Sequence, residues 1–191
     1  MKRRVQNVVA EASQVLQDLP DITHLGNPIL RQKCTSVSIP EGKEIAKKLI
    51  KTLTKYREIA GIGAGLAAPQ IGIPKCVFVT FAEMGYETYI NPTIVSTSDE
   101  TNFYRESCIS SRVVWGEVER PASIEIKWTN EQSEEHTQKF SGFMGRLLQH
   151  EYDHLLGVPC LDKAIPGTIE YAGEVKDEEL REASLVASTN S

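Results

Sequence analysis

The stretch Gln149-His150-Glu151-Tyr152-Asp153-His154 decides how the fold of this chain is interpreted. Histidines four residues apart on a helix project from one face, so His150 and His154 can bind one cation. Glu151 lies about 100° further round the helix and close to the same ion. In metal hydrolases, a glutamate placed in this way takes a proton from water and passes it to the leaving group. The spacing therefore predicts a metal-binding helix.

The helix that carries this stretch is expected to run over residues 142–156, because Gly157 and Pro159 are stop signals. Phe143 and Leu147 fall on the same side as the two histidines, so we expect that whole side to point inward. Buried imidazoles need polar partners, and one cation would satisfy both of them. A chance pairing of two histidines on a solvated face does not explain the apolar stripe.

Two histidines leave a tetrahedral catalytic site one protein ligand short. A cysteine, a carboxylate or another histidine could supply it, but His24 and His136 lie in polar, loop-like contexts. Cys108, in the segment 106–110 (ESCIS), has the most suitable context, although spacing alone leaves Cys76 open. A lone cysteine is otherwise more often a small buried apolar residue than a ligand.

The rest of the chain predicts an α+β fold with small mixed or antiparallel sheets packed around the metal-binding helix. We interpret residues 1–191 as one catalytic domain, with an amphipathic helix over about 1–20 and a polar, acidic tail over about 173–191. Asn27-Pro28 is typical of a short helical turn, and a second long helix is expected over 43–56. Strands are predicted at 76–81, 86–90, 93–96 and 124–128.

Composition excludes several classes of protein. The net charge of −5 argues against a surface that binds nucleic acid broadly. No run reaches the roughly 18 to 20 apolar residues that span a bilayer, and polar residues interrupt the segment after Met1 where a signal peptide would be apolar. The four cysteines contain no CxxC pair. We therefore expect reduced thiols, a cytoplasmic protein, no membrane contact and no specific nucleic-acid partner.

Three segments resemble, in order, the signature motifs of the peptide deformylase family. Residues 63–70 (GAGLAAPQ) resemble its GxGxAAPQ loop, residues 106–110 its EGCLS strand and residues 150–154 its HExDH helix. The likeness extends over about 22–162, which is most of the chain. It implies a metal-dependent hydrolase that removes the N-formyl group from the initiator methionine of nascent polypeptides and releases formate.

The resemblance also implies a role for each matching residue. Glu151 would act as general base and acid, while the side chain of Gln70 and the backbone N–H of Ile109 would donate hydrogen bonds to the formyl oxygen. The resemblance implies Fe²⁺ as the native metal, and the ligand set also suits Zn²⁺, Ni²⁺ or Co²⁺. The implied metal ligands are Cys108, His150 and His154.

The substrate is expected to bind as an added strand, as the family binds it. Gly63 and Gly65 would let a peptide backbone approach closely, and the formyl-methionyl chain would pair near Ala64 and Ser107. The family commonly has glycine at the position of Ser107, and we expect serine to be tolerated there in extended backbone. Candidates for the methionine pocket are Ala64, Phe143 and Leu147.

Two charged residues are candidates for support behind the ligands. We expect Arg120 to pair with Asp153 and hold the helix, although both could instead be solvated surface charges. The acidic tail has only Lys176 and Arg181 as basic residues after Gly173, so we expect transient proximity to ribosomes without a basic carboxyl-terminal anchor.

Two other functions remain open from the sequence. A zinc endopeptidase shares the HExxH pattern, but it would need a third ligand downstream, where the chain offers Cys160, Asp162 and glutamates but no histidine. A non-catalytic homologue that keeps its metal and binds peptides is the second alternative, and Ser107 is its main support.

Overall fold

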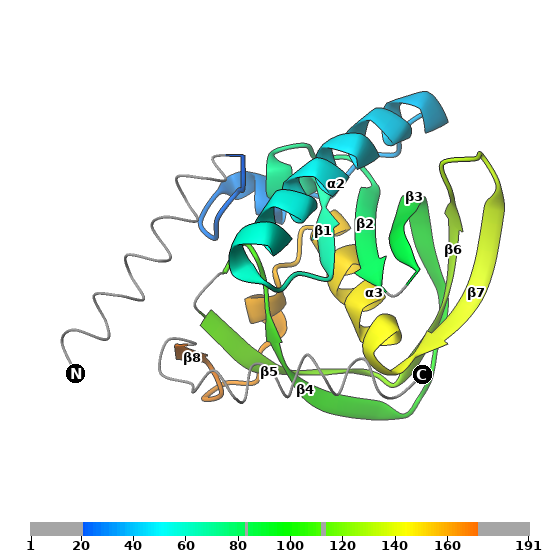
Figure 1. The fold of residues 1–191 in the computed structure, drawn as a ribbon. Helices are drawn as coiled ribbons and strands as arrows, with labels where there is room; N and C mark the ends of the chain where they lie inside the picture. The colour runs from blue at the N-terminus through cyan, green and yellow to red at the C-terminus, as the bar shows by residue number, and fades with distance from the viewer. Residues whose placement is uncertain (1–20, 83, 112–113, 172–191) are drawn as a thin grey trace.

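A five-stranded antiparallel sheet separates two long helices in the computed structural model, which describes residues 21–82, 84–111 and 114–171 (Figure 1). The helices are α2 (Ile39–Ala60) and α3 (Gly142–Leu155). The strands follow the order β1-β2-β3-β6-β7. They are β1 (Gly65–Ala67), β2 (Val77–Ala82), β3 (Gly85–Thr97), β6 (Ser123–Thr129) and β7 (Glu135–Ser141).

Successive side chains of β2 point to opposite faces of this sheet, and both faces are covered. Val77 and Val79 pack with the apolar side of α2, whereas Phe78 packs with Leu148 and Leu155 of α3. Successive strand residues point to opposite faces, so a strand buried on both faces must be apolar throughout. Each such side chain, when removed from water, contributes roughly 1.5 to 3 kcal/mol. The sheet therefore fixes the face of α3 that points into the molecule.

A second sheet closes the other side of α3 (Figure 1). It has the order β4-β5-β8 and consists of β4 (Thr101–Ser107), β5 (Val114–Pro121) and the short β8 (Glu170–Tyr171). Side chains of β4 and β5 reach α3, as the ion pairs described below show. The helix that carries the histidines is thus enclosed between two sheets, and the predicted α+β architecture is confirmed.

The helix ends follow recognisable capping signals. The side chain of Ser38 caps α2 by accepting a hydrogen bond from the N–H of Glu41 (3.4 Å), and Gly61 ends the helix with φ 70°. The prediction of 43–56 was too short, because Ser38 and the following Pro40 are start signals that the apolar periodicity does not register. The short helix η1 (Pro28–Arg31) begins as predicted, with Asn27 accepting from the N–H of Ile29 (3.1 Å).

The strand predictions needed three corrections. The two strands predicted at 86–90 and 93–96 are one strand, β3, with a register shift where Asn91 takes φ 51°. The side chain of Asn91 bonds both backbone groups of Val37, which holds this irregularity in place. His136 lies in β7 and stacks on Trp128 instead of lying in a loop. Cys108 lies just after the last residue of β4, not within the strand.

The predicted terminal segments, about 1–20 and 173–191, lie outside the described residues. Within residues 21–82, 84–111 and 114–171, no helix combines the length and apolar character needed to cross a membrane.

Candidate metal centre

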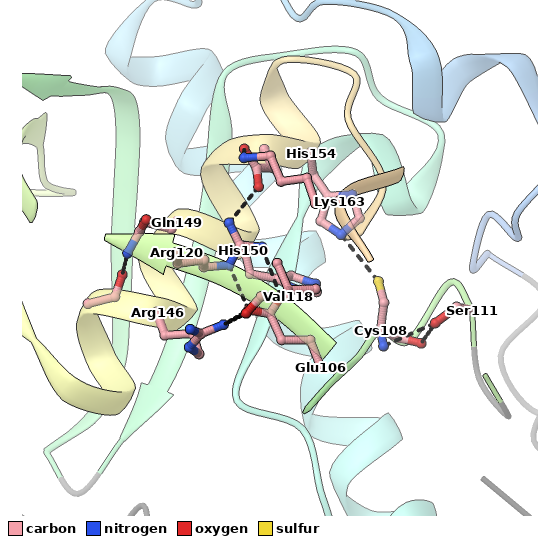
Figure 2. A network of polar contacts seen from close by, with 12 residues as sticks. Glu106, Cys108, Ser111, Val118, Arg120, Arg146, Gln149, His150, His154 and Lys163 are labelled. Atoms are coloured by element: carbon pink, nitrogen blue, oxygen red, sulfur yellow. Dashed lines mark hydrogen bonds and ion pairs between the residues drawn. The ribbon is translucent and has the colours of Figure 1, made fainter. Parts of the chain in front are cut away.

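Three potential ligand atoms converge between the helix and the second sheet. Cys108, His150 and His154 are all buried, and their ligand atoms lie within 4.8 Å of one another. The sulfur of Cys108 lies 3.2 Å from Nε2 of His154 (Figure 2). A thiolate and two imidazoles form a donor set that suits a divalent transition-metal ion. The three side chains therefore fit such an ion, which would take water as its fourth ligand.

Hydrogen bonding orients the imidazole of His150. Its Nδ1 lies 3.0 Å from Oε2 of Glu106, so Nε2 remains for a metal. Burial lowers the pKa of His150, but the hydrogen bond with Glu106 and the nearby negative charges of Glu151 and Glu106 together outweigh burial and raise this pKa to about 9. A proton and a cation therefore compete for Nε2. Burial holds the pKa of His154 well below its usual value, so that imidazole is neutral.

Glu106 is the centre of a buried ion-pair network (Figure 2). Its carboxylate accepts hydrogen bonds from Arg120 Nε (2.6 Å) and Nη2 (2.8 Å) and from Arg146. Burial raises the pKa of Glu106, but the bonds from Arg120 and His150 outweigh burial and hold the pKa well below its usual range. Glu106 is thus a permanent carboxylate that links two arginines to a metal-ligand candidate.

Glu106 and Arg146 were not identified as site residues from the sequence. Glu106 is the first residue of the quoted ESCIS segment, so its place in the motif was a usable signal. Arg146 lies one helical turn before His150 and faces the same sheet. It also donates to the backbone oxygen atoms of Val118 (3.0 Å) and Asn102 (2.8 Å).

The predicted contact between Arg120 and Asp153 is present in the structure. Nη1 of Arg120 donates to Oδ2 of Asp153 at 2.6 Å, and only 2% of the Arg120 side chain is exposed. Lys163 donates to the other carboxylate oxygen of Asp153 at 2.8 Å. Neither Arg120 nor Asp153 is a solvated surface charge. Because Asp153 precedes His154, these bonds hold the end of α3 that carries a ligand.

Glu151 lies in a tight, buried place beside the ligand atoms. Only 3% of the residue is exposed, and its Oε2 has no hydrogen-bond partner within the described part of the chain. Burial raises the pKa of Glu151 to about 7, against the opposing effect of His150. A Cβ atom on Gly65 would lie 2.4 Å from Oε1 of this carboxylate. Gly65 therefore leaves the space that Glu151 occupies.

The substitution Gly65→Ala is expected to lower kcat at least tenfold, because the added methyl group displaces the carboxylate of Glu151. Gly42→Ala is a matched control. Gly42 lies on helix α2, away from the ligand atoms, and a Cβ atom there would lie 2.8 Å from the side chain of Ile90. Overpacking should cost both variants about 1 to 3 kcal/mol in the free energy of unfolding. Hydrolytic turnover and urea unfolding should be measured for both, and equal losses of kcat would contradict the proposed fit between Gly65 and Glu151.

Gln70 and Ile109 flank Cys108 with hydrogen-bond donors. The side chain of Gln70 is fixed through Oε1, which accepts from the N–H of Ala67 (2.7 Å), so Nε2 points to the sulfur of Cys108 (3.2 Å). Nε2 also lies 3.3 Å from the hydroxyl of Ser110. The backbone N–H of Ile109 donates to no group among the described residues. Both donors can therefore serve a ligand beside Cys108.

The predicted substrate-binding residues lie in different environments. Ser107 ends β4 opposite Trp115 in ordinary extended backbone, as expected, so serine is not strained there. Gly63 has φ +127° and requires glycine. The backbone oxygen of Ala64 already accepts from the N–H of Phe81 (2.7 Å), so an added strand must use other groups.

The expectation that Phe143 points inward was wrong. It is 44% exposed, whereas Leu147 one turn later is partly buried and the two histidines are buried. The helix starts directly after the edge strand β7, and its first turn extends beyond the cover of the sheets. Periodicity identifies a face of a helix but not the point at which that face becomes covered.

The comparisons with known proteins agree with this geometry. Residues 19–168 match the family model described as polypeptide deformylase. The chain belongs to the peptide deformylase family. The match includes all three peptide deformylase motifs. A peptide deformylase of Pseudothermotoga lettingae is 39% identical over 150 residues, which cover 78% of this chain and 84% of that protein.

Solved peptide deformylase structures share the fold. The crystal structure from Thermotoga maritima has a TM-score of 0.70 and 34% identity, and the match covers 76% of this chain and 97% of that one. A class I type b peptide deformylase from Acinetobacter baumannii, bound to Met-Ala-Ser, has a TM-score of 0.68 and 29% identity over 74% of this chain and 96% of that chain.

Proposed function

We propose that this protein removes the formyl group from the amino-terminal methionine of nascent polypeptides and releases formate. The observation that carries this function is the buried group of Cys108, His150 and His154 with the carboxylate of Glu151 beside it. The family match over residues 19–168 includes this whole group. Hydrolysis of a formamide needs acidified water, a base and hydrogen-bond donors for the developing oxyanion.

The three ligand side chains would hold one divalent cation. Such a cation, when bound, would lower the pKa of water and polarise the formyl carbonyl group. We propose Fe²⁺ as the native metal, while Zn²⁺, Ni²⁺ and Co²⁺ also suit one sulfur and two nitrogen ligands. Metal analysis after anaerobic purification tests this assignment, and a protein that retains full activity without any transition metal would contradict it.

The remaining chemistry would come from the side chains and backbone of the chain. Oε2 of Glu151 is buried and has no hydrogen-bond partner among the described residues, so it would accept the proton of the attacking water and return it to the leaving amine nitrogen. A pKa of about 7 suits both steps near neutral pH. Gln70 Nε2 and the N–H of Ile109 would donate to the formyl oxygen as it gains negative charge.

The substrate would enter beside the loop 63–65 and the end of β4. We propose that the peptide lies along Gly63, Gly65 and Ser107, and that Ala64 and Leu147 contact the methionine side chain. The exposed ring of Phe143 would then lie at the mouth of the pocket, not in its wall. The Met-Ala-Ser complex of the Acinetobacter baumannii protein supports a methionyl peptide as the ligand class.

The activity is tested with two substrates. The metal-loaded protein should release formate from formyl-Met-Ala-Ser and should leave casein intact. A zinc endopeptidase would cleave casein, but the ligand group found here takes its third member from upstream of the helix. Tight binding of the peptide without formate release would instead favour the non-catalytic alternative.

Arg120→Ala is expected to weaken metal retention about 10- to 100-fold, because Arg120 holds both Glu106 and Asp153 next to the ligand histidines. Arg105→Ala on the neighbouring strand β4 is a control, since Arg105 is 48% exposed, pairs with Glu170 and lies over the ring of Trp115, away from the ligand histidines. Metal should be titrated out of both variants with a chelator. Unchanged metal retention in Arg120→Ala would show that Arg120 does not support the metal site.

We further propose a cytoplasmic enzyme that meets ribosomes transiently and whose residues 174–191 do not anchor it to ribosomal RNA. Residues after Gly173 include Glu174, Asp177, Glu178 and Glu179, whose charge is repelled by ribosomal RNA. Deletion of these residues should leave ribosome co-sedimentation unchanged at every salt concentration. Co-sedimentation that is lost with the deletion would contradict this.

A further inference from the structure

The loop that joins α2 to β1 contains part of the proposed peptide-binding segment but has no regular structure of its own. It covers residues 61–64, and both of its glycines, Gly61 and Gly63, have positive φ angles, of 70° and 127°. Glycine adopts many backbone conformations, so a segment of this kind loses much conformational entropy when it becomes ordered. Contacts from outside the loop are therefore needed to hold it in one shape.

Arg57, in the last turn of α2, contacts this loop at two points. Its backbone oxygen accepts a hydrogen bond from the N–H of Gly61 at 2.9 Å. Its guanidinium group donates through Nη1 to the backbone oxygen of Gly63. A basic residue at the carboxyl end of a helix usually interacts with the last carbonyl groups of that helix. The side chain of Arg57 instead binds a carbonyl group beyond the helix, in the loop.

An aromatic ring holds the guanidinium group in place. The central carbon of this group lies 3.7 Å from the centroid of the Phe81 ring. The Phe81 ring packs against Tyr86, with centroids 4.9 Å apart, and the hydroxyl of Tyr86 lies 2.6 Å from that of Thr54, one turn before Arg57. These contacts form a closed ring between α2 and the strands β2 and β3. Arg57 is thus fixed at both ends of its side chain.

The same contacts fix the direction of two peptide units in the loop. Arg57 binds the carbonyl group of Gly63, and the N–H of Phe81 binds that of Ala64 at 2.7 Å. In a trans peptide unit, the N–H points opposite to the carbonyl group. The bond from Phe81 in β2 therefore directs the N–H of Gly65 to the open edge of the sheet, because β1 is an edge strand. An added strand would pair at this edge.

The loop also packs closely against the helix. A Cβ atom on Gly63 would lie 3.0 Å from the ring of Tyr56 and 3.2 Å from the side chain of Leu53. Gly63 therefore lies directly against α2, and its carbonyl group is within reach of Arg57 only in this arrangement. Loss of the guanidinium group would leave the loop with packing but without a directional contact from α2 to Gly63.

We propose that Arg57 is a positioning residue that holds residues 61–64 in the conformation that receives the peptide. The inference deepens the proposed function and rests on it, because it takes the loop to bind a formyl-methionyl chain. Arg57 acts through the carbonyl group of Gly63 and touches no reacting atom. A loop that is already ordered loses less entropy when a peptide binds, so the contribution of Arg57 is to affinity.

The chemistry itself does not depend on this contact. Gly65 lies in β1 and pairs with Thr80, so its close fit to Glu151 is fixed by the sheet. The three proposed metal ligands come from α3 and the end of β4. Loss of Arg57 should therefore raise KM and leave kcat and metal retention nearly unchanged, which is the pattern of lost binding shared by substrate and transition state.

The first experiment compares Arg57→Met with the control Lys51→Ala, an exposed position on the same helix. Arg57→Met keeps an apolar side chain against Phe81 but removes the donor. Its KM for formyl-Met-Ala-Ser should rise about 5- to 30-fold with kcat within about threefold of the wild type. The Kd of Met-Ala-Ser for the Zn²⁺-loaded protein should rise by the same factor, and Arg57→Lys should lie between. Lys51→Ala should match the wild type.

The second experiment measures hydrogen exchange in the Zn²⁺-loaded proteins without any peptide. Amides of residues 61–65 should exchange roughly fivefold faster or more in Arg57→Met than in the wild type, while those of α3 keep their rates. Exchange in the loop that stays as slow as in the wild type would overturn the proposal. So would an unchanged Kd for Met-Ala-Ser, a loss confined to kcat, or an equal loss in Lys51→Ala.

The two experiments separate this inference from the proposed function. A wild-type protein that neither releases formate nor binds Met-Ala-Ser would contradict the proposed function, and hydrogen exchange alone would then decide whether Arg57 holds the loop. If Arg57→Met does not fold, the comparison of Arg57→Lys with the wild type decides. Equal affinity and equal exchange in those two proteins would overturn the proposal.

Discussion

Replacing Glu151 with glutamine is expected to lower kcat for formate release by about a thousandfold, within the range that general acid–base catalysis contributes. Glutamine has nearly the same shape and fills the space left by Gly65, but it cannot take a proton from water. The carboxylate that it replaces is 3% exposed and has a pKa raised to about 7 by burial. Steady-state formate release from formyl-Met-Ala-Ser measures the effect.

Metal content separates this loss from a loss of the site. Glu151 is not a member of the group formed by Cys108, His150 and His154, so Glu151→Gln should keep one equivalent of metal. It should also keep the affinity for a methionyl peptide within a fewfold. A kcat within threefold of the wild type, at full metal occupancy, would show that another group moves the proton.

Glu106→Gln is expected to have the largest effect on folding, about 3 to 5 kcal/mol in the free energy of unfolding. Its carboxylate compensates the guanidinium groups of Arg120 and Arg146, and removal of the charge leaves them buried with too little negative charge. The same oxygen atoms hold Nδ1 of His150, so metal affinity should fall about 10- to 100-fold. Urea unfolding of the metal-free protein and a metal competition assay measure the two effects.

Glu119→Gln is the matched control for Glu106. Glu119 lies on the neighbouring strand β5 and is exposed, and among the described residues its carboxylate bonds only the hydroxyl of Thr101. Its replacement should change the free energy of unfolding by less than about 0.5 kcal/mol. If both variants unfold at the same urea concentration, the buried network around Glu106 does not stabilise the fold in the way described.

The histidine ligands and Glu151 could be predicted from the sequence because their geometry is local. A helix fixes the positions of residues one turn apart, so the spacing alone defines a shared face. Cys108 comes from a different part of the chain, and its choice over Cys76 depended on the motif around it. The network of Glu106, Arg120 and Arg146 could not be derived in the same way, because it joins two strands and a helix that only the tertiary structure brings together.

The strands also differ in how well the sequence predicted them. β2 was predicted almost to its ends because it is apolar on both faces, whereas β7 (Glu135–Ser141) is largely exposed and polar and gave no signal. The sequence predicted two strands in place of β3, because asparagine at position 91 is a residue type common in turns. In the structure its side chain bonds Val37, and the strand continues. Local residue preference was overridden there by a tertiary contact.

The position of Cys108 beyond the end of β4 has a thermodynamic consequence. The sulfur and the imidazole of His154 lie 46 residues apart in the chain and on opposite sides of an internal boundary between sheet and helix. An ion held by both would cross-link these two layers and close a long loop, which favours the folded chain over the unfolded ensemble. Metal binding and folding are therefore linked equilibria. The cellular concentration of the ion would affect both the fraction of the protein that stays folded and the fraction that is active.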